Sequence, residues 1–343
     1  MFDDPRQINI ADFPAKAKFA EQIRFILNYA VLAPSTHNSQ PWLFNIEGPA
    51  CKIYYDPSLI LPEADPESRD LHISIGCAIE NLVLAAKYFN IFRSIRYNRL
   101  KNTNLLAVVR FKQYKGAVNN KYKTVLETIA KRVNARGLFS AESIPPATLN
   151  SISSRTHSYL VDGVKVHWIT KQDKILELSR ITANGLKVAY RKPAFRREMA
   201  QWLRHSLTKR KDGLPGYALK MPLLLSFILP SLIRRFNLGG LLAKLNYRSL
   251  SSAPLLTVIT ASKNTPGTWL NVGRLAERLM LEFNSLNWQT SIFVAAVEMG
   301  DFYREVQKVI RTKQRPQFIF AIGKVNSLQR PTPRHGLAKK IIP

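Results

Sequence analysis

Apolar side chains recur at helical spacing in three long stretches of the chain. From Phe19 to Leu32 they fall on one stripe of a helix, and from Leu71 to Ala86 they cover nearly the whole helix surface. A third stretch, from Thr268 to Leu286, keeps its apolar residues on one face. A helix with a full apolar face packs in a core, and one that is apolar nearly all round belongs in the middle of a domain or at an interface. We therefore expect three core helices.

Shorter apolar runs, some alternating with polar residues, predict strands. Two of them flank the Gly48-Pro49 turn, and the others cover residues 91–98, 105–112, 165–170, 254–261 and 315–325. Further helices are expected at residues 121–131, 173–207 and 298–310. The order strand, helix, connecting loop, helix, strand occurs in each half of the chain. This order predicts an α+β protein with two related halves.

The segment between the first helix and the first strand has the sequence APSTHNSQPW, from Ala33 to Trp42. Pro34 cannot continue a helix and Pro41 lacks a backbone donor, so the residues between them form a loop. Six small polar side chains follow one another there: Ser35, Thr36, His37, Asn38, Ser39 and Gln40. They suit a planar ligand rich in heteroatoms, and they equally suit an ordinary helix-capping turn that satisfies its own polar groups.

This loop resembles the flavin-contacting loop of the nitroreductase family, whose members commonly carry Ala-Pro-Ser-x-x-Asn-x-Gln-Pro-Trp there. The stretch from Pro62 to Asn90 is similar to the second helix of that family, particularly of the fused, two-halved nitroreductase-like proteins that include the mycobacterial dormancy-associated members. The resemblance implies a nitroreductase-like α+β fold. Each half would have a mixed or antiparallel sheet flanked by helices, and the two halves would form an intramolecular pseudo-dimer.

The pattern starts again near Lys131. The sequence Arg132-Val-Asn134-Ala-Arg136, followed by Ile-Pro-Pro at residues 144–146, resembles the Arg-x-Ser-x-Arg stretch of nitroreductase subunits, with Asn in place of Ser. Two arginines at this spacing can converge on one phosphate, and the alternative is a solvated basic helix end. We place the first half at residues 1–130 and the second at residues 131–343.

Composition bounds the class of protein. The chain has 343 residues, 46% of them hydrophobic, which is enough for one large domain or two ordinary ones. Cys51 and Cys77 form neither a metal-spaced cluster nor a disulfide framework, which favours a reducing compartment. Since no secretory signal and no apolar run of ~20 residues is visible, we expect a cytoplasmic protein.

The charge is strongly positive, with 51 Lys and Arg against 23 Asp and Glu, a formal net charge of +28. Such an excess attracts anions, whether cofactor phosphates, nucleic acid or an anionic membrane, unless it is a general basic bias of the sequence. No helix-turn-helix spacing, zinc knuckle or ribonucleoprotein-type aromatic signature is present, so we expect no nucleic-acid partner.

A basic insertion is expected in the second half, at about residues 190–250. Between Arg191 and Arg248 there are 13 Lys and Arg against two acids, and the apolar run YALKMPLLLSFILPSLIRRF lies within this segment. Fused nitroreductase-like proteins carry a variable insertion at this point, which implies a lid over a ligand pocket. The basic flanks leave peripheral contact with an anionic membrane open.

The resemblance implies one cofactor site, with residues from both halves. They are Pro34, Ser35, Thr36, Asn38, Gln40, Arg132, Asn134, Arg136, Val294, Ala295, and Arg330 or Arg334. A second site at the pseudo-equivalent position lacks its parts, because residues 12–22 contain no Arg-x-Ser-x-Arg stretch and residues 153–163 contain no Pro-Ser-x-x-Asn loop. We expect one FMN per chain and no metal.

The implied activity is that of an NAD(P)H-dependent FMN oxidoreductase. Hydride from NADH or NADPH would reach the flavin, and the electrons would pass to a nitroaromatic or quinone-like acceptor. No catalytic acid or base is required, and His37 is either a proton donor or a hydrogen-bonding spacer. The alternatives are a flavin-binding or storage protein without turnover, and a peripheral membrane or anion-binding module. Higher oligomers stay open.

Overall fold

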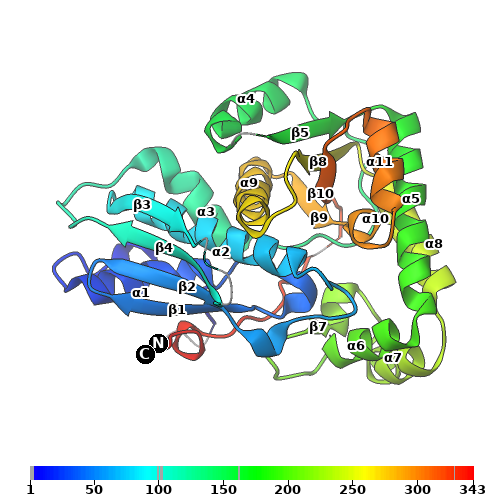
Figure 1. Cartoon of the computed structure of the whole chain (residues 1–343), viewed down its shortest axis with the longest axis horizontal. Coiled ribbons are helices and arrows are strands. Elements are labelled where there is room, and N and C mark those ends of the chain that lie inside the picture. Colours follow the sequence, from blue (N-terminus) through cyan, green and yellow to red (C-terminus); the bar gives the residue numbers. More distant parts are fainter. Residues whose placement is uncertain (1–3, 99, 101–102, 161–162, 328) are drawn as a thin grey trace.

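Two four-stranded antiparallel sheets form the framework of the chain (Figure 1). The computed structural model describes residues 4–98, 100, 103–160, 163–327 and 329–343. The first sheet has the order β1-β2-β4-β3, with β1 (Trp42–Glu47), β2 (Ala50–Tyr55), β3 (Phe92–Tyr97) and β4 (Leu105–Phe111). The second has the order β5-β8-β10-β9, with β5 (Val164–Ile169), β8 (Leu255–Ala261), β9 (Gln289–Ile292) and β10 (Arg315–Gly323).

Helices surround and connect the two sheets. They are α1 (Phe19–Ala30), α2 (Arg69–Tyr88), α3 (Lys123–Lys131), α4 (Pro146–Thr156), α5 (Gln172–Arg191), α6 (Pro193–Trp202), α7 (Leu223–Arg235), α8 (Gly239–Ser251), α9 (Pro266–Ser285), α10 (Ala295–Glu298) and α11 (Phe302–Ile310). The expected α+β class with antiparallel sheets is confirmed. Residues 161–162 of the segment 153–163, and Leu328 at the start of the basic tail, lie outside the described residues.

The two sheets are built in the same order. In the first half the chain runs α1-β1-β2-α2-β3-β4, and in the second it runs α4-β5-β8-α9-β9-β10 once two insertions are set aside. The larger insertion, between β5 and β8, contains α5 to α8, and the smaller one, between β9 and β10, contains α10 and α11. The division of the chain at residue 130 stays a prediction.

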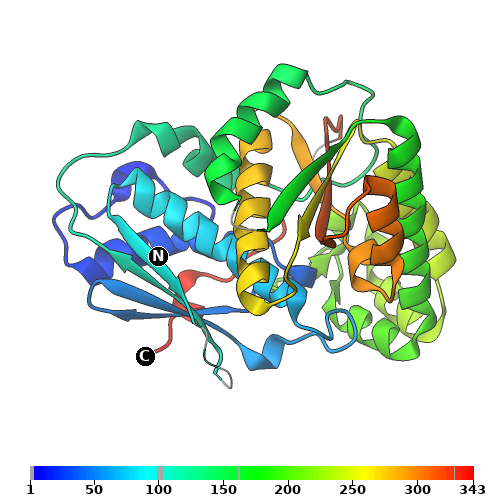
Figure 2. The same ribbon diagram turned by 45° about the horizontal axis from the view of Figure 1, so that its top comes forward.

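Helices α2 and α9 pack directly against each other between the two sheets (Figure 2). A Cβ atom added to Gly76 of α2 would lie 2.3 Å from Leu270 O, and one added to Gly273 of α9 would lie 2.0 Å from Ile73 O. Real Cβ contacts below 3.0 Å essentially never occur. Glycine at both positions is therefore what lets the two backbones approach so closely.

The two central helices also end alike. Asn90 after α2 and Asn287 after α9 both have a left-handed backbone, with φ of 53° and 62°. The next N–H groups, of Ile91 and Trp288, donate to carbonyls five residues back, at 2.8 and 3.0 Å. Asn tolerates this conformation better than most residues. Both the glycine pair and the asparagine pair are separated by 197 residues, so α2 and α9 occupy equivalent places in the two halves.

The beginning of α2 is capped by a side chain that lies before its first turn. The carboxylate of Asp65 accepts a hydrogen bond from the N–H of Leu71 at 2.8 Å. Ser68 has φ of 55° and makes no side-chain cap bond. Asp65 therefore caps the helix, from outside its first turn.

The basic region expected as helix from residue 173 to 207 is divided. Helix α5 ends at Arg191 and α6 begins at Pro193. Lys192 between them has an extended backbone, because the residue before a proline is disfavoured in the helical conformation. Residues 203–204 form the short strand β6, which pairs in parallel with β7 (Leu214–Pro215). None of the helices in the described part of the chain is long and apolar enough to cross a membrane.

The C-terminal tail returns to the first sheet. The N–H of Phe44 in β1 donates to Lys340 O at 2.7 Å, and the N–H of Ile342 donates to Phe44 O at 2.8 Å. The last residues of the second half therefore lie along the edge strand of the first. This arrangement brings the basic tail to the loop that precedes β1.

Candidate functional site

The loop between α1 and β1 has a strained and well-fixed backbone. His37, Asn38 and Gln40 all have positive φ, between 52° and 58°. Non-glycine residues rarely adopt this conformation, and it is found most often at functional sites. The hydroxyl of Ser35 accepts a hydrogen bond from the N–H of Gln40 at 2.9 Å, which closes the loop, and the N–H of Thr36 contacts Ser74 Oγ of α2 at 3.4 Å.

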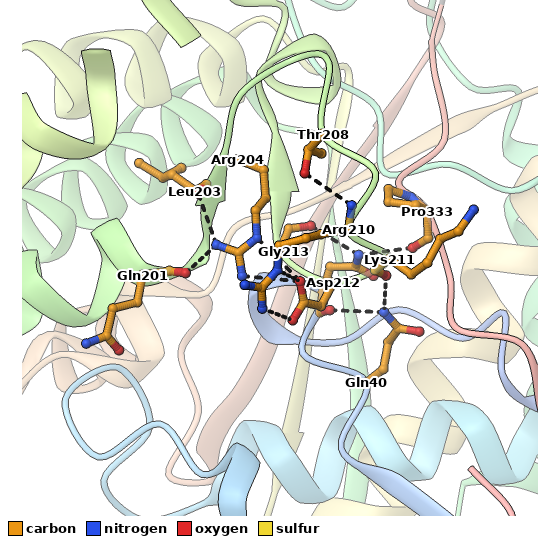
Figure 3. A network of polar contacts seen from close by, with 11 residues as sticks. Gln40, Gln201, Leu203, Arg204, Thr208, Arg210, Lys211, Asp212, Gly213 and Pro333 are labelled. Atoms are coloured by element: carbon orange, nitrogen blue, oxygen red, sulfur yellow. Dashed lines mark hydrogen bonds and ion pairs between the residues drawn. The ribbon is translucent and has the colours of Figure 1, made fainter. Parts of the chain in front are cut away.

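Two amide side chains of this loop bind the insertion and the tail (Figure 3). Asn38 Nδ2 donates to Gly213 O at 3.1 Å and to Pro333 O at 3.0 Å. Gln40 Nε2 donates to Lys211 O at 2.7 Å, and Gln40 Oε1 accepts from the N–H of His335 at 2.8 Å. Segments more than 170 residues apart in the sequence therefore meet at this loop.

The insertion segment that reaches the loop is itself rigid. Asp212 pairs with Arg204 at 3.2 Å and with Arg210 at 2.8 Å, as Figure 3 shows. The hydrogen bond from Arg210, together with the charge of Arg204, lowers the pKa of Asp212 to about 2 against the effect of burial. These pairs hold the carbonyls of residues 211 and 213 toward Gln40 and Asn38.

Arg334 of the tail is buried against the same loop. Its guanidinium donates to Asn38 Oδ1 at 2.6 Å and to Ala33 O at 3.2 Å. Burial lowers its pKa, and the positive charges of Arg6 and Arg132 lower it further. Beside it, Lys340 Nζ donates to Gln40 O at 2.6 Å. The expected approach of the tail to the Pro34–Gln40 loop is thus present in the structure through Arg334.

Arg132 is buried at the base of the same region. Its Nε lies 3.3 Å from Glu277 Oε1 of α9, and its guanidinium donates to Leu32 O at 3.2 Å. Glu277 has no exposed surface, and burial raises its pKa while the charge of Arg132 opposes this rise. A buried carboxylate without a counter-ion would be very unfavourable, so Glu277 and Arg132 depend on each other.

Three arginines, Arg6, Arg132 and Arg334, feel the charge of that one buried carboxylate. Arg6 donates to the carbonyls of Ala130 and Arg132 at 2.8 and 3.2 Å. The charges of Arg132 and Glu277 both act on its pKa, in opposite directions. Burial and the charge of Arg132 lower its pKa to about 10, although Asp4 acts in the opposite direction. Arg330 lies over the ring of Tyr217 at 4.4 Å. The positive charges of Arg330, Arg6 and Arg334 all oppose the rise that burial causes in the pKa of Tyr217. The cluster therefore carries a positive charge that Glu277 does not balance.

Asn134 and Arg136 lie on an extended segment beside β9. Asn134 Oδ1 accepts a hydrogen bond from the N–H of Ile292 at 2.8 Å, and the backbone of Arg136 is bound on both sides by the amide of Gln329. Within the described residues, the guanidinium of Arg136 has no hydrogen-bond or ion-pair partner, and burial lowers its pKa. Whether Arg132 and Arg136 converge on one anion stays a prediction, because Arg132 is already paired.

Val294 and Ala295 stand at the start of α10, directly after β9. Gly185 of α5 packs against them, because a Cβ at that position would lie 2.6 Å from Ala295 O. On the other side, Arg69 donates to Val297 O at 2.7 Å and pairs with Asp70 at 3.2 Å. This pairing joins α10 to the beginning of α2.

A group of carboxyls and one histidine lies between the loop and α10. Burial and the charge of Asp70 raise the pKa of Asp65 to about 7 and raise that of Glu298 as well. His37 faces Asp70, yet burial lowers its pKa to about 4, and its Nε2 has no partner within the described residues. His37 is therefore neutral at neutral pH and presents an unsatisfied ring nitrogen.

The structure thus brings most of the predicted residues into one region. Pro34, the polar loop and Arg334 meet directly, Arg132 joins them through Leu32 O, and Asn134 is bonded to the strand that leads to Val294. Sequence reasoning missed Arg6, Glu277 and the insertion carbonyls at 211 and 213. Nothing local marks them, since each acts through a contact across more than 100 residues.

No protein-family model matches the chain. Two curated proteins of Mycobacterium tuberculosis, from the strains CDC 1551 and H37Rv and each named "Putative NAD(P)H nitroreductase", are 38% identical to it over 66 residues. This match spans 19% of the chain and 19% of each relative. The resemblance to nitroreductases is confirmed over that stretch.

Solved structures of FMN proteins resemble the chain at low identity. The FMN- and NADPH-dependent nitroreductase NfnB of Sphigopyxis sp. strain HMH is 16% identical, with a TM-score of 0.44, over 63% of this chain and 96% of that one. A nitroreductase with bound FMN from Desulfitobacterium hafniense DCB-2 is 13% identical, with a TM-score of 0.39, over 61% and 92%. Iodotyrosine deiodinase bound to FMN and 3-iodo-L-tyrosine is 17% identical, with a TM-score of 0.39, over 62% and 95%.

Proposed function

We propose that the chain is an FMN-dependent oxidoreductase of the nitroreductase kind, with one flavin per chain in the region around the Pro34–Gln40 loop. The observation that carries the proposal is that Arg6, Arg132 and Arg334 bind the carbonyls of Arg132, Leu32 and Ala33, while among the described residues only Arg132 of the three has a carboxylate partner, Glu277. Buried cations in excess of anions are stabilised by an anionic ligand, and guanidinium groups suit a phosphate best.

The residues present fit a flavin phosphate and a flavin ring. Arg136 is a partly buried cation without a side-chain partner, and His37 Nε2 is a buried ring nitrogen without one. Buried polar atoms in folded proteins usually have a partner, and a ligand would supply one for His37 Nε2. Arg132, Arg136 and Arg330 would hold the phosphate and the anionic edge of the ring, while Ser35, Thr36 and the N–H groups near Ala295 would face its polar atoms.

When bound, FMN supplies the transfer of hydride and electrons, and this chain supplies orientation and electrostatics. The buried arginines favour negative charge on a bound ligand. Neutral His37 can accept or donate one hydrogen bond, but it is not a source of a proton at neutral pH because its pKa is about 4. The electron donor would be NADH or NADPH, and the acceptor an aromatic nitro compound or a quinone.

A second function, that of a flavin-binding protein without turnover, is favoured by one observation. The amides of Asn38 and Gln40 are already bonded to the insertion carbonyls of Gly213 and Lys211. If these bonds persist in the flavin-loaded protein, the insertion restricts access of a nicotinamide to the flavin. The insertion would then act as a closed lid.

Titration of the purified protein with FMN tests the binding part of the proposal. We expect saturation at one flavin per chain, and Arg136→Gln should weaken binding by about tenfold or more, because a charge-assisted hydrogen bond is lost. Arg136 has no side-chain partner to lose, so the fold should be unchanged. The matched control is Arg93→Gln on β3, an exposed arginine far from the loop, which removes the same charge. Equal weakening by both variants would refute the site.

Anaerobic addition of NADPH to the flavin-loaded protein separates the two functions. Rapid loss of the flavin absorbance bands is expected for the oxidoreductase. Bands that persist with both NADPH and NADH would favour the flavin-holding protein. An Asp212→Asn variant, which loosens the insertion segment, should then restore reduction if the lid is the obstacle.

A further inference from the structure

An apolar face of α7 stands out on the surface of the insertion. Five large apolar side chains are exposed within six consecutive residues: Leu223, Leu224, Leu225, Phe227 and Ile228. Leu224 is 81% exposed and Ile228 is 54% exposed. Soluble proteins rarely gather exposed apolar residues in this way unless they bind something there.

The helix is oriented by its buried side. Ser226, Leu229 and Ile233 are buried at helical spacing and fix α7 on α6 and on the segment after β6, where the N–H of Ser206 donates to Ser226 Oγ at 3.0 Å. The opposite rows, which begin at Leu224 and Phe227, must therefore point outward. Figure 1 shows α7 at the end of the molecule away from the first sheet.

The next exposed apolar residues lie close by in the sequence and in space. The ring of His205 stacks on Phe227 with 4.7 Å between ring centres, and Leu207, two residues further on, is 66% exposed. Phe236 at the end of α7 is also exposed. The apolar face thus continues from α7 to the loop after β6.

The charge around this face has one sign. The outward rows of α7 end in exposed Arg234 and Arg235, and exposed Lys209 follows Leu207. The sequence contains no Asp or Glu from residue 213 to residue 276. Asp212, the last acid before this stretch, is already paired with Arg204 and Arg210, and Glu198 of α6 is buried and accepts from the N–H groups of Glu63 and Ala64.

We propose that α7 and the Leu207 loop dock on the surface of an anionic phospholipid membrane, with the apolar side chains inserted among the acyl chains and the arginines at the headgroups. A helix that is apolar on one side and basic at its rim lies in the interface plane rather than across the bilayer. Helix α7 has 13 residues, about 20 Å in length, which is too short to span a membrane.

Two other occupants fit less well. A second copy of the chain in a twofold contact would place this acid-free basic rim against itself, which is electrostatically unfavourable. A protein partner would need polar contacts to fix its register, and the outward rows from Leu223 to Ile228 offer none. A lipid surface can bind this face without specific polar contacts. Its acyl chains accommodate the apolar side chains, and its headgroups supply the negative charge. The inference does not depend on the proposed flavin.

Co-sedimentation with vesicles tests the proposal. The full chain should sediment with phosphatidylcholine vesicles that contain phosphatidylglycerol, much less with phosphatidylcholine alone, and less again at high salt. Leu224→Asn/Ile228→Asn should lower the partition coefficient by about tenfold or more, because two apolar insertions are lost. Leu286→Asn, an exposed leucine at the end of α9, is the control for the same change elsewhere.

The charged rim is tested in the same assay. Arg234→Gln/Arg235→Gln should lower binding to anionic vesicles by about tenfold or more at low salt. Arg93→Gln/Arg96→Gln on β3 removes the same two charges from another face and should have little effect. If both double variants lose binding equally, net charge and not this face is responsible, and the proposal is wrong.

A labelling measurement covers the case in which a variant folds poorly. Cys51 and Cys77 are buried, so an environment-sensitive thiol dye can be attached selectively to Leu224→Cys. Its emission should shift to shorter wavelength on addition of anionic vesicles, and that of labelled Leu286→Cys should not. A shift that appears with protein concentration in the absence of lipid would show self-association instead, and no shift in either case would overturn the proposal.

Discussion

Two buried glutamates, Glu80 and Glu277, occupy equivalent positions in the two halves, 197 residues apart, yet their surroundings differ. Glu277 lies among Arg6, Arg132 and Arg334, a cluster with more positive than negative charge. Glu80 pairs with Arg274 at 3.0 Å, and none of the described residues of the tail or the polar loop is bonded to it. The centre at Glu277 thus has one carboxylate for its arginines, whereas at the other, Glu80 pairs with Arg274 and Glu282 pairs with Arg278 at 2.8 Å.

The region around Glu80 is closed by aromatic packing. Tyr159 lies beneath the guanidinium groups of Arg274 and Arg278 at 5.8 and 5.5 Å, and Lys87 lies 5.6 Å from the same ring. Cations on an aromatic face have part of their charge satisfied without an anion. The difference between the halves supports the proposed single ligand site.

The largest effect is expected at the crossing that holds both halves together. Gly273→Ala would place a methyl group within 2.0 Å of Ile73 O, so α2 and α9 must separate, at a cost of about 3 kcal/mol of unfolding free energy or more. Urea unfolding measures this loss. Gly267→Ala near the start of α9 meets no atom within 4 Å and should be neutral or stabilising by up to about 1 kcal/mol. Similar values for both variants would contradict the close crossing.

The next effect compares the two glutamates directly. Glu277→Gln removes the one buried carboxylate among three arginines and should cost about 3 kcal/mol, and Glu80→Gln should cost a similar amount by leaving Arg274 unpaired. Addition of FMN should recover stability in Glu277→Gln, since a bound phosphate replaces the lost charge, and the recovery should be smaller in Glu80→Gln. Thermal unfolding with and without FMN measures both. Equal recovery would remove the asymmetry between the halves.

A smaller effect concerns the carboxyls beside the polar loop, which have no counterpart in the other half. Burial raises the pKa of Asp65 from 3.8 to about 7, so between these pH values the folded chain holds a proton that the unfolded chain releases. Stability should therefore fall as pH rises from about 4 to 7 and then level off, by about 1 to 2 kcal/mol in all. Asp65→Asn keeps an acceptor for the N–H of Leu71 and should flatten this dependence. If the unfolding free energy depends on pH in the same way in the natural chain and in Asp65→Asn, Asp65 is ionised over this whole pH range and the account of it is wrong.

The smallest effect is expected in the region around Glu80, where Tyr159 packs against two arginines. Tyr159→Leu removes the ring beneath Arg274 and Arg278 and should cost about 1 kcal/mol in urea unfolding. It should leave the flavin content unchanged, because the chain still lacks an Arg-x-Ser-x-Arg stretch and a Pro-Ser-x-x-Asn loop for that position. A variant that takes up a second flavin would show that Tyr159 alone blocks a latent site.

Local sequence signals predicted much of the fold. Pro34 and Pro41 bracket the polar loop as expected, and the apolar stretches after Phe19, Leu71 and Thr268 became α1, α2 and α9. The helical end expected at residue 207 was wrong, because the chain becomes extended after Trp202 and pairs with residues 214–215.

The site could be predicted only in part. The loop and Arg334 could be predicted, since the prolines, the small polar residues and the basic tail can be recognised in the sequence alone. Arg6, Glu277 and the carbonyl of Gly213 act through contacts with residues more than 100 positions away, and a backbone carbonyl has no sequence signature at all. The close packing of α2 and α9 at Gly76 and Gly273 could not be predicted for the same reason. An isolated glycine in a helical pattern usually indicates only a less stable helix.

The most direct test of the single-site account is the flavin content of the protein after saturation with FMN and removal of the excess. Absorbance of the flavin bands, set against protein concentration, should give a ratio near one for the natural chain, and the ratio should fall in Arg136→Gln while staying near one in Arg93→Gln. A ratio near two, or a saturated complex that Arg136→Gln leaves untouched, would contradict the assignment of one flavin to the arginines beside the Pro34–Gln40 loop.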